Sequence, residues 1–489
     1  MPSSSVAAIP TPAATTTRQL GRLRFNEEDQ LRFASLTGDR NPMHVDPVAA
    51  RRLITGRPVV HGIHVLLAAL ERLPERQPLG GLRLSAEFVN PVSVGDEVMF
   101  ASGCNELGHD QLWAEVDGLV CTRVVWEPAP GSRSMAYGTL QGDALTETVV
   151  ITEEPLDRTP EDWVGRRQTL ALPIAEFQSS FPALCQDWGE RTVAAIGLLS
   201  TYVGMVCPGQ HSVFASVSLA AGHAVEELVF EVQRHDPRFG LYTITFDGAL
   251  HGQIKAFVRP QPQTQPSILT LASRVAADAF AGRHAWVIGG SRGLGELSAK
   301  LIAAGGGEVT ITFTTGSDDA NRVAKEIAEA GFRPAEVASL NVATDDVRAW
   351  VADHACPDAV FYFPSPRIFR KSAHLVDAVV LNDFLDCYVH HFAALCEAIA
   401  GKTDRPVSIF VPSSIAISER PRGLVEYAMA KAAAEILLVD LAREHRQLRF
   451  VVERLPRLAT DQTSTLAGSR APAGTDVLLP LVHRVMSGG

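Results

Sequence analysis

Two different rhythms of apolar and polar positions divide the chain. In the last third, apolar runs that predict strands alternate with amphipathic stretches that predict helices. The strand-like runs lie at 285–290, 308–314, 359–363, 407–411 and 449–455, and the helical stretches lie near 294–302, 319–330, 382–400 and 426–443. Such alternation predicts a parallel sheet covered on both faces, the doubly wound α/β arrangement.

The first ~270 residues are richer in turn signals and in strand-like runs. Helix-like stretches occur near 60–72 and 190–206, and each precedes further strand-like runs. Residues 33–39 (FASLTGD) resemble residues 181–187 (FPALCQD), and a glycine follows each aspartate at a similar distance, Gly62 after Asp39 and Gly209 after Asp187. This similarity predicts two copies of one α+β unit, with chance similarity as the alternative.

Composition shifts predict five segments. A Ser/Thr/Pro/Ala-rich tail covers 1–18, a first α+β unit covers 19–130, a linker whose start is marked by the run PAPGS (128–132) covers 131–170, a second unit covers 171–265 and the α/β domain covers 266–489. The run QPQTQP marks the last boundary.

Composition and charge exclude several classes of protein. With 46% hydrophobic and 20% charged residues the chain resembles an ordinary globular protein, and a net charge of −11 without a basic stripe argues against nucleic-acid binding. The seven cysteines are scattered and contain no C-x-x-C pair, so we expect neither a metal site nor a disulfide framework. This cysteine usage also predicts a cytoplasmic location. No apolar run reaches the ~18 residues of a membrane span, and the tail lacks the features of a signal peptide.

The segment FASLTGDRNPMHVDPVAA (33–50) carries the first candidate site. Pro42 favours extended angles at Asn41, and Asp46-Pro47 is typical of a helix start that continues through residue 54. Asp39 and His44 would then lie on a tight loop that can direct a carboxylate and an imidazole at one water, a pairing suited to acid–base catalysis. The spacing also fits a simple capping turn with His44 on the surface.

This segment resembles the signature of the MaoC-like (R)-specific enoyl-thioester hydratases, which have a hot-dog fold. The matching residues are Phe33, Thr37, Gly38, Asp39, Asn41, Pro42, Met43, His44 and Ala50, with Met43 in place of a branched aliphatic residue. PVVHGIHVLL (58–67) resembles the start of the family's central helix. The resemblance implies that Asp39 and His44 activate the water that adds to or leaves C3, that the Gly62 N–H polarises the thioester carbonyl, and that His61 orients the loop.

In the second unit the position matching His44 is Thr192. Without a base this copy is expected to be inactive. In double hot-dog hydratases such a half serves as a structural partner, and the resemblance implies the same role here.

A second candidate site lies in the α/β domain. Gly289, Gly293 and Gly295 form a G-x-x-x-G-x-G turn between a predicted strand and helix, the context in which backbone N–H groups and a helix N-terminus hold a pyrophosphate. Taken alone, it is also compatible with an ordinary glycine-rich turn.

Ser414, Tyr427 and Lys431 follow further along the chain. Tyr427 and Lys431 share a helix face, so the ammonium would lower the pKa of the phenol and let it donate a proton to a developing alkoxide beside Ser414. A surface helix pair is the alternative for the Tyr–Lys spacing alone.

Motifs and order resemble the short-chain dehydrogenase/reductase family, which implies a Rossmann-like fold. The cofactor-binding residues implied are Gly289, Ser291, Arg292, Gly293, Leu294, Gly295, Asn341 and Thr460. No acidic residue precedes Asp318 after the second strand, and Arg292 is available for a 2′-phosphate, so we expect NADP(H). The chain departs from the family at 361–366, at Asn341 where an aspartate is usual, and at Cys387 or a neighbour, where the family has an asparagine.

Together the two sites predict a bifunctional 3-oxoacyl-thioester reductase and 3-hydroxyacyl-thioester dehydratase of fatty-acid or polyketide biosynthesis. The acyl thioester would be carried by acyl carrier protein or coenzyme A, and the chain would form a homo-oligomer, a dimer, without nucleic-acid or membrane partners. Three alternatives remain open: the oxidative direction, a dehydratase with an inactive reductase domain, and a non-catalytic acyl-carrier-binding module.

Overall fold

The computed structural model describes residues 17–53, 55–128, 146–158, 162–173, 176–370, 373–463 and 472–488. The chain divides into two compact units. The N-terminal unit comprises Met1–Arg51 and Arg57–Gln261, and the C-terminal unit comprises Arg52–Gly56 and Pro262–Gly489. Most of the predicted tail, residues 1–16, lies outside the described residues.

The described part of the N-terminal unit contains one mixed sheet of eleven strands in the order β1-β3-β4-β5-β2-β8-β11-β10-β9-β7-β6. All neighbours are antiparallel except β6 and β7. The strands are β1 (Arg18–Arg24), β2 (Leu82–Phe88), β3 (Glu97–Cys104), β4 (Asp110–Val116), β5 (Leu119–Pro128), β6 (Thr146–Thr148), β7 (Arg167–Ala171), β8 (Ser212–Ala221), β9 (Glu227–Asp236), β10 (Leu241–Gly248) and β11 (Leu250–Val258).

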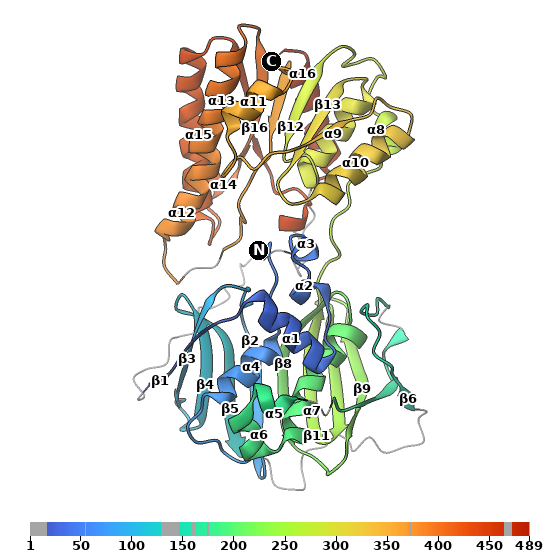
Figure 1. Ribbon diagram of the computed structural model, residues 1–489, viewed down its shortest axis with the longest axis vertical. Helices are drawn as coiled ribbons and strands as arrows, with labels where there is room; N and C mark the ends of the chain where they lie inside the picture. The colour runs from blue at the N-terminus through green and yellow to red at the C-terminus, as the bar shows by residue number, and fades with distance from the viewer. Residues whose placement is uncertain are drawn as a thin grey trace. The chain divides into compact units, whose positions relative to one another are not determined.

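Strand order repeats within this sheet. Strands β7 to β11 occupy the same relative positions as β1 to β5, and β2 pairs with β8 where the two halves meet. A buried helix precedes each of these two central strands, α4 (Gly62–Glu71) before β2, and α7 (Glu190–Thr201) with the π-helix η2 (Tyr202–Val206) before β8. Both helices lie over the same face of the sheet (Figure 1). We call residues 17–128 the first half and 146–261 the second half.

These helices lie where the sequence predicts them, but the predicted residue pairing between the copies is wrong. Gly62 begins α4, whereas Gly209 follows η2, and Thr192 lies inside α7. Residues 172–189, which precede α7, nevertheless contain no histidine, so the second half still lacks a counterpart of His44.

The predicted linker at 131–170 is partly ordered sheet. It contains β6 and the start of β7, and the fully buried Trp163 packs in the core of the unit; residues 129–145 lie outside the described residues.

The described C-terminal unit has six parallel strands in the order β14-β13-β12-β15-β16-β17. The strands are β12 (His284–Ile288), β13 (Glu308–Phe313), β14 (Glu336–Ser339), β15 (Ala359–Tyr362), β16 (Val407–Ser414) and β17 (Leu448–Leu455). Every strand and helix that the apolar pattern predicts for this region is found.

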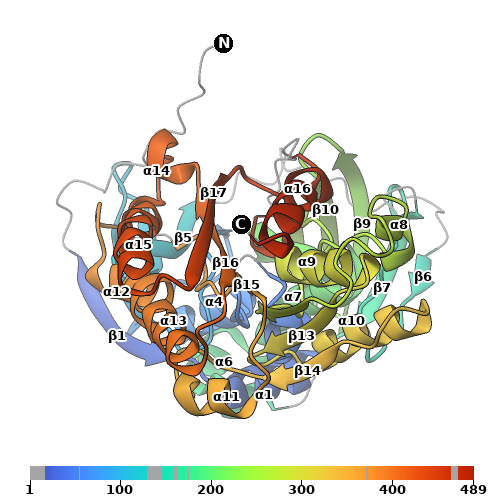
Figure 2. The same ribbon diagram turned by 90° about the horizontal axis from the view of Figure 1, so that it is seen from above.

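Helices cover both faces of this parallel sheet (Figure 2). One group comprises α8 (Ile268–Ala272), α9 (Gly293–Ala304), α10 (Ser317–Glu329) and α16 (Gly474–Met486). The other comprises α11 (Val347–Asp353), α12 (Ala378–Leu385), the π-helix η3 (Asp386–His390), α13 (His391–Lys402) and α15 (Val425–Glu444). The carboxyl ends of parallel strands meet at one edge, so the segments after β12, β14, β16 and β17 share that edge.

Across the described ranges, no helix combines the length and apolarity that crossing a bilayer requires.

Candidate active sites

The segment that carries Asp39 and His44 is positioned by two helices. Helix α1 (Glu27–Thr37) ends at Gly38, whose φ of +87° is readily adopted only by glycine and turns the chain into Asp39. Helix α2 (Pro42–Val45) begins at Asn41, whose side chain accepts from the Met43 N–H, so His44 lies on a helical turn and not on a loop. The predicted helix through residue 54 ends early, because α3 covers only Pro47–Ala50.

Asp39 and His44 converge. A carboxylate oxygen of Asp39, a ring nitrogen of His44 and a ring nitrogen of His61 all lie within 4.8 Å of one another. The His44 Nδ1 lies 2.6 Å from the Val59 carbonyl oxygen, which can only accept, so Nδ1 carries the proton of the neutral ring. Its Nε2 therefore retains the lone pair, which is the form a general base requires. Burial lowers the pKa of His44, against the effect of Asp39, and this keeps the ring neutral.

Asp39 is almost fully buried, at 1% exposure. Its Oδ2 accepts from the Ser200 hydroxyl at 2.6 Å, and its Oδ1 accepts from the Asn41 N–H at 3.3 Å. Burial raises the pKa of Asp39, while His44, Ser200 and Asn41 lower it. The carboxyl group is thus held by fixed donors in a buried site, where its protonation is sensitive to each of them.

His61 serves as a support for this pair. It is fully buried, its ring stacks on His44 at 3.8 Å between centroids, and its Nε2 lies 3.0 Å from the Asp39 carbonyl oxygen. Its Nδ1 lies 3.0 Å from Gln30 Oε1. Asp39, His44 and His61 are close enough to hold a metal ion, but both ring nitrogens of His61 already have protein partners, so the arrangement fits acid–base chemistry better.

Gly62 is the first residue of α4, and a Cβ at this position would lie 3.0 Å from the Phe88 ring. Within the described residues its N–H has no protein acceptor. A free N–H at a helix start suits the stabilisation of a developing oxyanion, the role predicted for it.

The second half supplies contacts that sequence reasoning missed. Besides Ser200, the Thr201 hydroxyl donates to the Thr37 carbonyl at 2.6 Å, and the Asn41 amide donates to the Gly204 carbonyl at 2.8 Å. A Cβ at Gly204 would lie 2.3 Å from Asp39 Oδ1, so only glycine admits the carboxylate here. Small residues spaced three to four apart along the predicted helix 190–206 were the available signal for this close approach.

Replacing Ser200 by alanine tests this support. Loss of the donor raises the pKa of Asp39 further, so we expect the acidic limb of the hydration pH profile to move up by about one pH unit, with kcat about tenfold lower at neutral pH. Thr201→Val is the matched control, since it removes the neighbouring hydroxyl without touching the Asp39 carboxylate. An unchanged acidic limb in Ser200→Ala would contradict a role for this bond.

The glycine-rich turn of the C-terminal unit forms the predicted cradle between β12 and α9. Gly289 and Gly293 have φ of +76° and +59°. A Cβ at Gly295 would lie 2.2 Å from the Gly289 carbonyl oxygen, so the turn closes tightly only with glycine. The N-terminus of α9, with Ser291 and Leu294 beside it, can accept a diphosphate.

Other predicted cofactor residues are also at this edge of the sheet. A Cβ on Gly293 would lie 3.8 Å from Thr460 Cγ2, and Asn341 follows β14, where its side chain accepts from the Ala343 N–H. Arg292 forms an ion pair with Asp461, because its Nη1 lies 3.4 Å from Asp461 Oδ2. A 2′-phosphate would therefore share this guanidinium with Asp461.

Ser414, Tyr427 and Lys431 lie at the end of β16 and along α15. A hydrogen bond from Ser414 lowers the pKa of Tyr427, but burial has the larger effect and raises it, in the direction opposite to the sequence prediction. The Lys431 Nζ lies 5.8 Å from the centre of the Tyr427 ring. Burial lowers the pKa of Lys431 to about 8.

Residues near Cys387, where the sequence departs from the pattern it resembles, also contact the Ser414–Tyr427–Lys431 group. Tyr388, in η3, places its ring 3.7 Å from Lys431 Nζ, and its hydroxyl lies 2.6 Å from Ser365 Oγ. The neighbouring Cys387 is buried and uses its backbone carbonyl to accept from the Tyr362 hydroxyl. The sequence located the departure near Cys387 but did not identify Tyr388.

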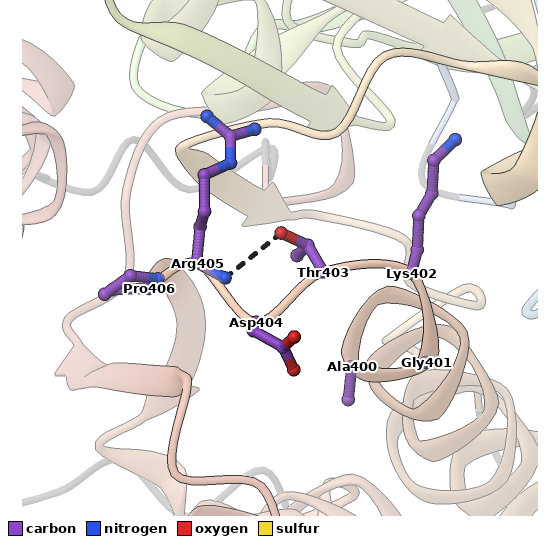
Figure 3. A pocket seen from close by; sticks show the side chains of 7 residues that line it. All are labelled: Ala400, Gly401, Lys402, Thr403, Asp404, Arg405 and Pro406. Atoms are coloured by element: carbon purple, nitrogen blue, oxygen red, sulfur yellow. Dashed lines mark hydrogen bonds between the residues drawn. The ribbon is translucent and has the colours of Figure 1, made fainter.

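A separate hollow of about 610 Å³ lies at the loop from α13 to β16, lined by Ala400, Gly401, Lys402, Thr403, Asp404, Arg405 and Pro406. In this loop the Arg405 N–H donates to Thr403 Oγ1 (Figure 3). The loop precedes the amino end of β16, so it lies away from the edge that carries Ser414 and the glycine turn.

Comparison with known proteins places these two sites. Residues 8–118 match the family of MaoC like domains. The (R)-specific enoyl-CoA hydratase of Aeromonas caviae is 41% identical over 81 residues, which are 15% of this chain and 58% of the hydratase, so the match spans little more than half of that relative.

The NADPH-dependent aldehyde reductase-like protein of Arabidopsis thaliana is 30% identical over 184 residues, which are 34% of this chain and 67% of that protein. Among solved structures, a short-chain dehydrogenase from Burkholderia cenocepacia in complex with NADP is 24% identical, with a TM-score of 0.38, and covers 42% of this chain and 91% of its own. One from Escherichia coli complexed with NADPH is 21% identical, with a TM-score of 0.39, and covers 43% and 92%.

The chain therefore carries an enzyme-type site in each unit, one of hydratase type and one of oxidoreductase type. Residues 8–118 carry a MaoC-like domain, and the C-terminal part of the chain belongs to the family of the NADPH-dependent aldehyde reductase-like protein.

Proposed function

We propose that this protein is a bifunctional 3-oxoacyl-thioester reductase and 3-hydroxyacyl-thioester dehydratase of fatty-acid or polyketide biosynthesis. In this proposal the N-terminal unit is a double hot-dog with one live site, and the C-terminal unit is a Rossmann-like reductase domain. The observation that carries it is the presence in one chain of two sites whose chemistries act successively on the same carbon. The fusion raises the effective concentration of the shared 3-hydroxyacyl intermediate.

In the hydration direction, His44 Nε2 takes a proton from the water that adds to C3, the Asp39 carboxyl helps to hold that water, and the proton then passes to C2. Dehydration follows the same steps in reverse. The Gly62 N–H donates to the thioester oxygen as negative charge develops there. Ser200, Gly204 and His61 keep Asp39 in place.

In the reductase step, bound NADPH supplies the hydride for the C3 carbonyl. Tyr427 donates its phenolic proton to the oxygen of that carbonyl, and Ser414 hydrogen-bonds the same oxygen. Gly289, Ser291, Gly293, Leu294 and Gly295 would hold the diphosphate of the cofactor, and Asn341 and Thr460 would contribute to its adenosine and nicotinamide sites. Lack of an acid before Asp318 supports NADP(H) over NAD(H).

The substrate is carried as a thioester of acyl carrier protein or coenzyme A, and the enzyme works in the cytoplasm. Exposed apolar side chains on α12 and α15, among them Val379, Ile436 and Val439, support a homo-oligomer, which we propose to be a dimer.

Intact-mass analysis of a 3-oxoacyl thioester, and in a separate reaction of a 3-hydroxyacyl thioester, each incubated with NADPH and the full chain, tests the proposal. The expected products from the 3-oxoacyl thioester are a reduced species 2 Da heavier than the substrate and a dehydrated species 18 Da lighter than that reduced species. Parallel reactions with coenzyme A and carrier-protein substrates reveal the carrier. If only the 3-hydroxyacyl thioester is dehydrated, the reductase domain is inactive. If neither thioester reacts, the bifunctional assignment fails and the acyl-carrier-binding alternative is favoured.

A further inference from the structure

Lys431 has an unusual environment for a lysine. Its side chain is buried, and its ammonium donates to one backbone oxygen, the Pro412 carbonyl, at 2.8 Å. Within the described residues, no carboxylate lies within 4.0 Å of Nζ. A buried ammonium that has a single oxygen acceptor needs another source of stabilisation.

The ring of Tyr388 supplies that source. Nζ lies 3.7 Å from the ring centre, well inside the ~6 Å range of a cation–π contact, whereas the Tyr427 ring is 5.8 Å away. Tyr388 is thus the closer aromatic neighbour of the ammonium.

The ring of Tyr388 is anchored at its hydroxyl and packs against two other aromatic rings. Its hydroxyl is tied to Ser365 Oγ at 2.6 Å, Phe384 packs nearly parallel to it at 5.8 Å, and Tyr427 meets it edge-on at 6.0 Å. The residue also lies in the π-helix η3, a local widening of the helix that often marks a functional position. The same ring therefore touches both members of the Tyr427–Lys431 pair.

We propose that Tyr388 is a positioning residue of the reductase site, whose ring face holds the Lys431 ammonium beside Tyr427. The inference rests on the proposed reductase function. It predicts that the ring of Tyr388 stabilises the Lys431 ammonium, and that the hydroxyl of Tyr388 serves mainly to anchor the ring to Ser365.

Three variants of the full chain separate these roles. Tyr388→Leu removes the ring, Tyr388→Phe keeps the ring and removes the hydroxyl, and Phe384→Leu is the matched control. Phe384 is buried and packs on both tyrosines, but it has no cation–π contact with Lys431.

The first readout needs neither cofactor nor turnover. The pH dependence of Lys431 acetylation by isotopically labelled acetic anhydride, followed by peptide mass spectrometry, reports the pKa of its amine. We expect a midpoint near pH 8 in the wild type, and about one pH unit lower in Tyr388→Leu but not in Tyr388→Phe or Phe384→Leu.

The second readout is the pH profile of NADPH oxidation with a 3-oxoacyl thioester. We expect kcat to fall about tenfold in Tyr388→Leu, with the basic limb moved to lower pH, because the ammonium is lost earlier. Equal effects in Phe384→Leu, or an unshifted midpoint in Tyr388→Leu, would overturn the inference. Absence of NADPH oxidation in the wild type would overturn the proposed function instead, and the acetylation result would still stand.

Discussion

Replacing His44 by alanine should lower the rate of enoyl-thioester hydration by about 10² to 10⁴-fold, while NADPH oxidation by the same preparation stays unchanged. The reason is the fixed tautomer: Nδ1–H donates to the Val59 carbonyl, and only Nε2 can take a proton. Loss of enoyl absorbance with a short-chain trans-2-enoyl thioester measures the rate.

The surface variant His223→Ala is the matched control, because this side chain is exposed in the same unit and should leave both activities unchanged. Burial lowers the pKa of His44 from 6.5, so the neutral base form persists at lower pH than for a free histidine, and the wild type should remain active somewhat below pH 6.5. Full hydration activity in His44→Ala would remove the basis of the lyase assignment.

Replacing Tyr427 by phenylalanine should lower NADPH oxidation by about 10² to 10⁴-fold and leave hydration intact. The substitution keeps the ring, and hence its contacts with Phe384 and Tyr388, and removes only the hydroxyl that donates the proton. Stopped-flow or steady-state loss of NADPH absorbance with a 3-oxoacyl thioester measures the effect.

Hydration by the same variant is the internal control for the N-terminal unit. A thermal melt then shows whether the substitution has caused a folding defect in the C-terminal unit. If Tyr427→Phe retains the reductase rate, another group donates the proton and the predicted Ser414–Tyr427–Lys431 mechanism is wrong.

Much of the fold follows from local sequence signals. The strands and helices of the C-terminal unit follow from the alternation of apolar runs with amphipathic stretches, because a doubly wound sheet buries its strands on both faces. The sequence comparison of the two halves wrongly matched Gly62 with Gly209, because both follow an aspartate at a similar distance. The two halves keep the same strand order, but the loops between matching elements differ in length.

The candidate sites were predictable where residues lie close in the chain. Asp39 and His44 are five residues apart, and Tyr427 and Lys431 share a helix turn. Ser200 and Gly204 lie more than 160 positions from Asp39, so the spacing of small residues in their helix indicates a close approach but does not identify Asp39 as the partner. Tyr388 contacts Lys431 from another helix, and no local pattern identifies it. The pKa direction of Tyr427 was also missed, because burial depends on the packing of the whole unit.

The hydrogen bond from Ser200 and the space at Gly204 have a practical consequence for anyone who wishes to excise or transplant the lyase module. A fragment cut at the limits of the MaoC-like match, residues 8–118, would omit all of β5 and the Ser200 hydroxyl that donates to the Asp39 carboxyl. A fragment that ends after Gln261 retains both, so the second half must accompany the first in any engineered chimera.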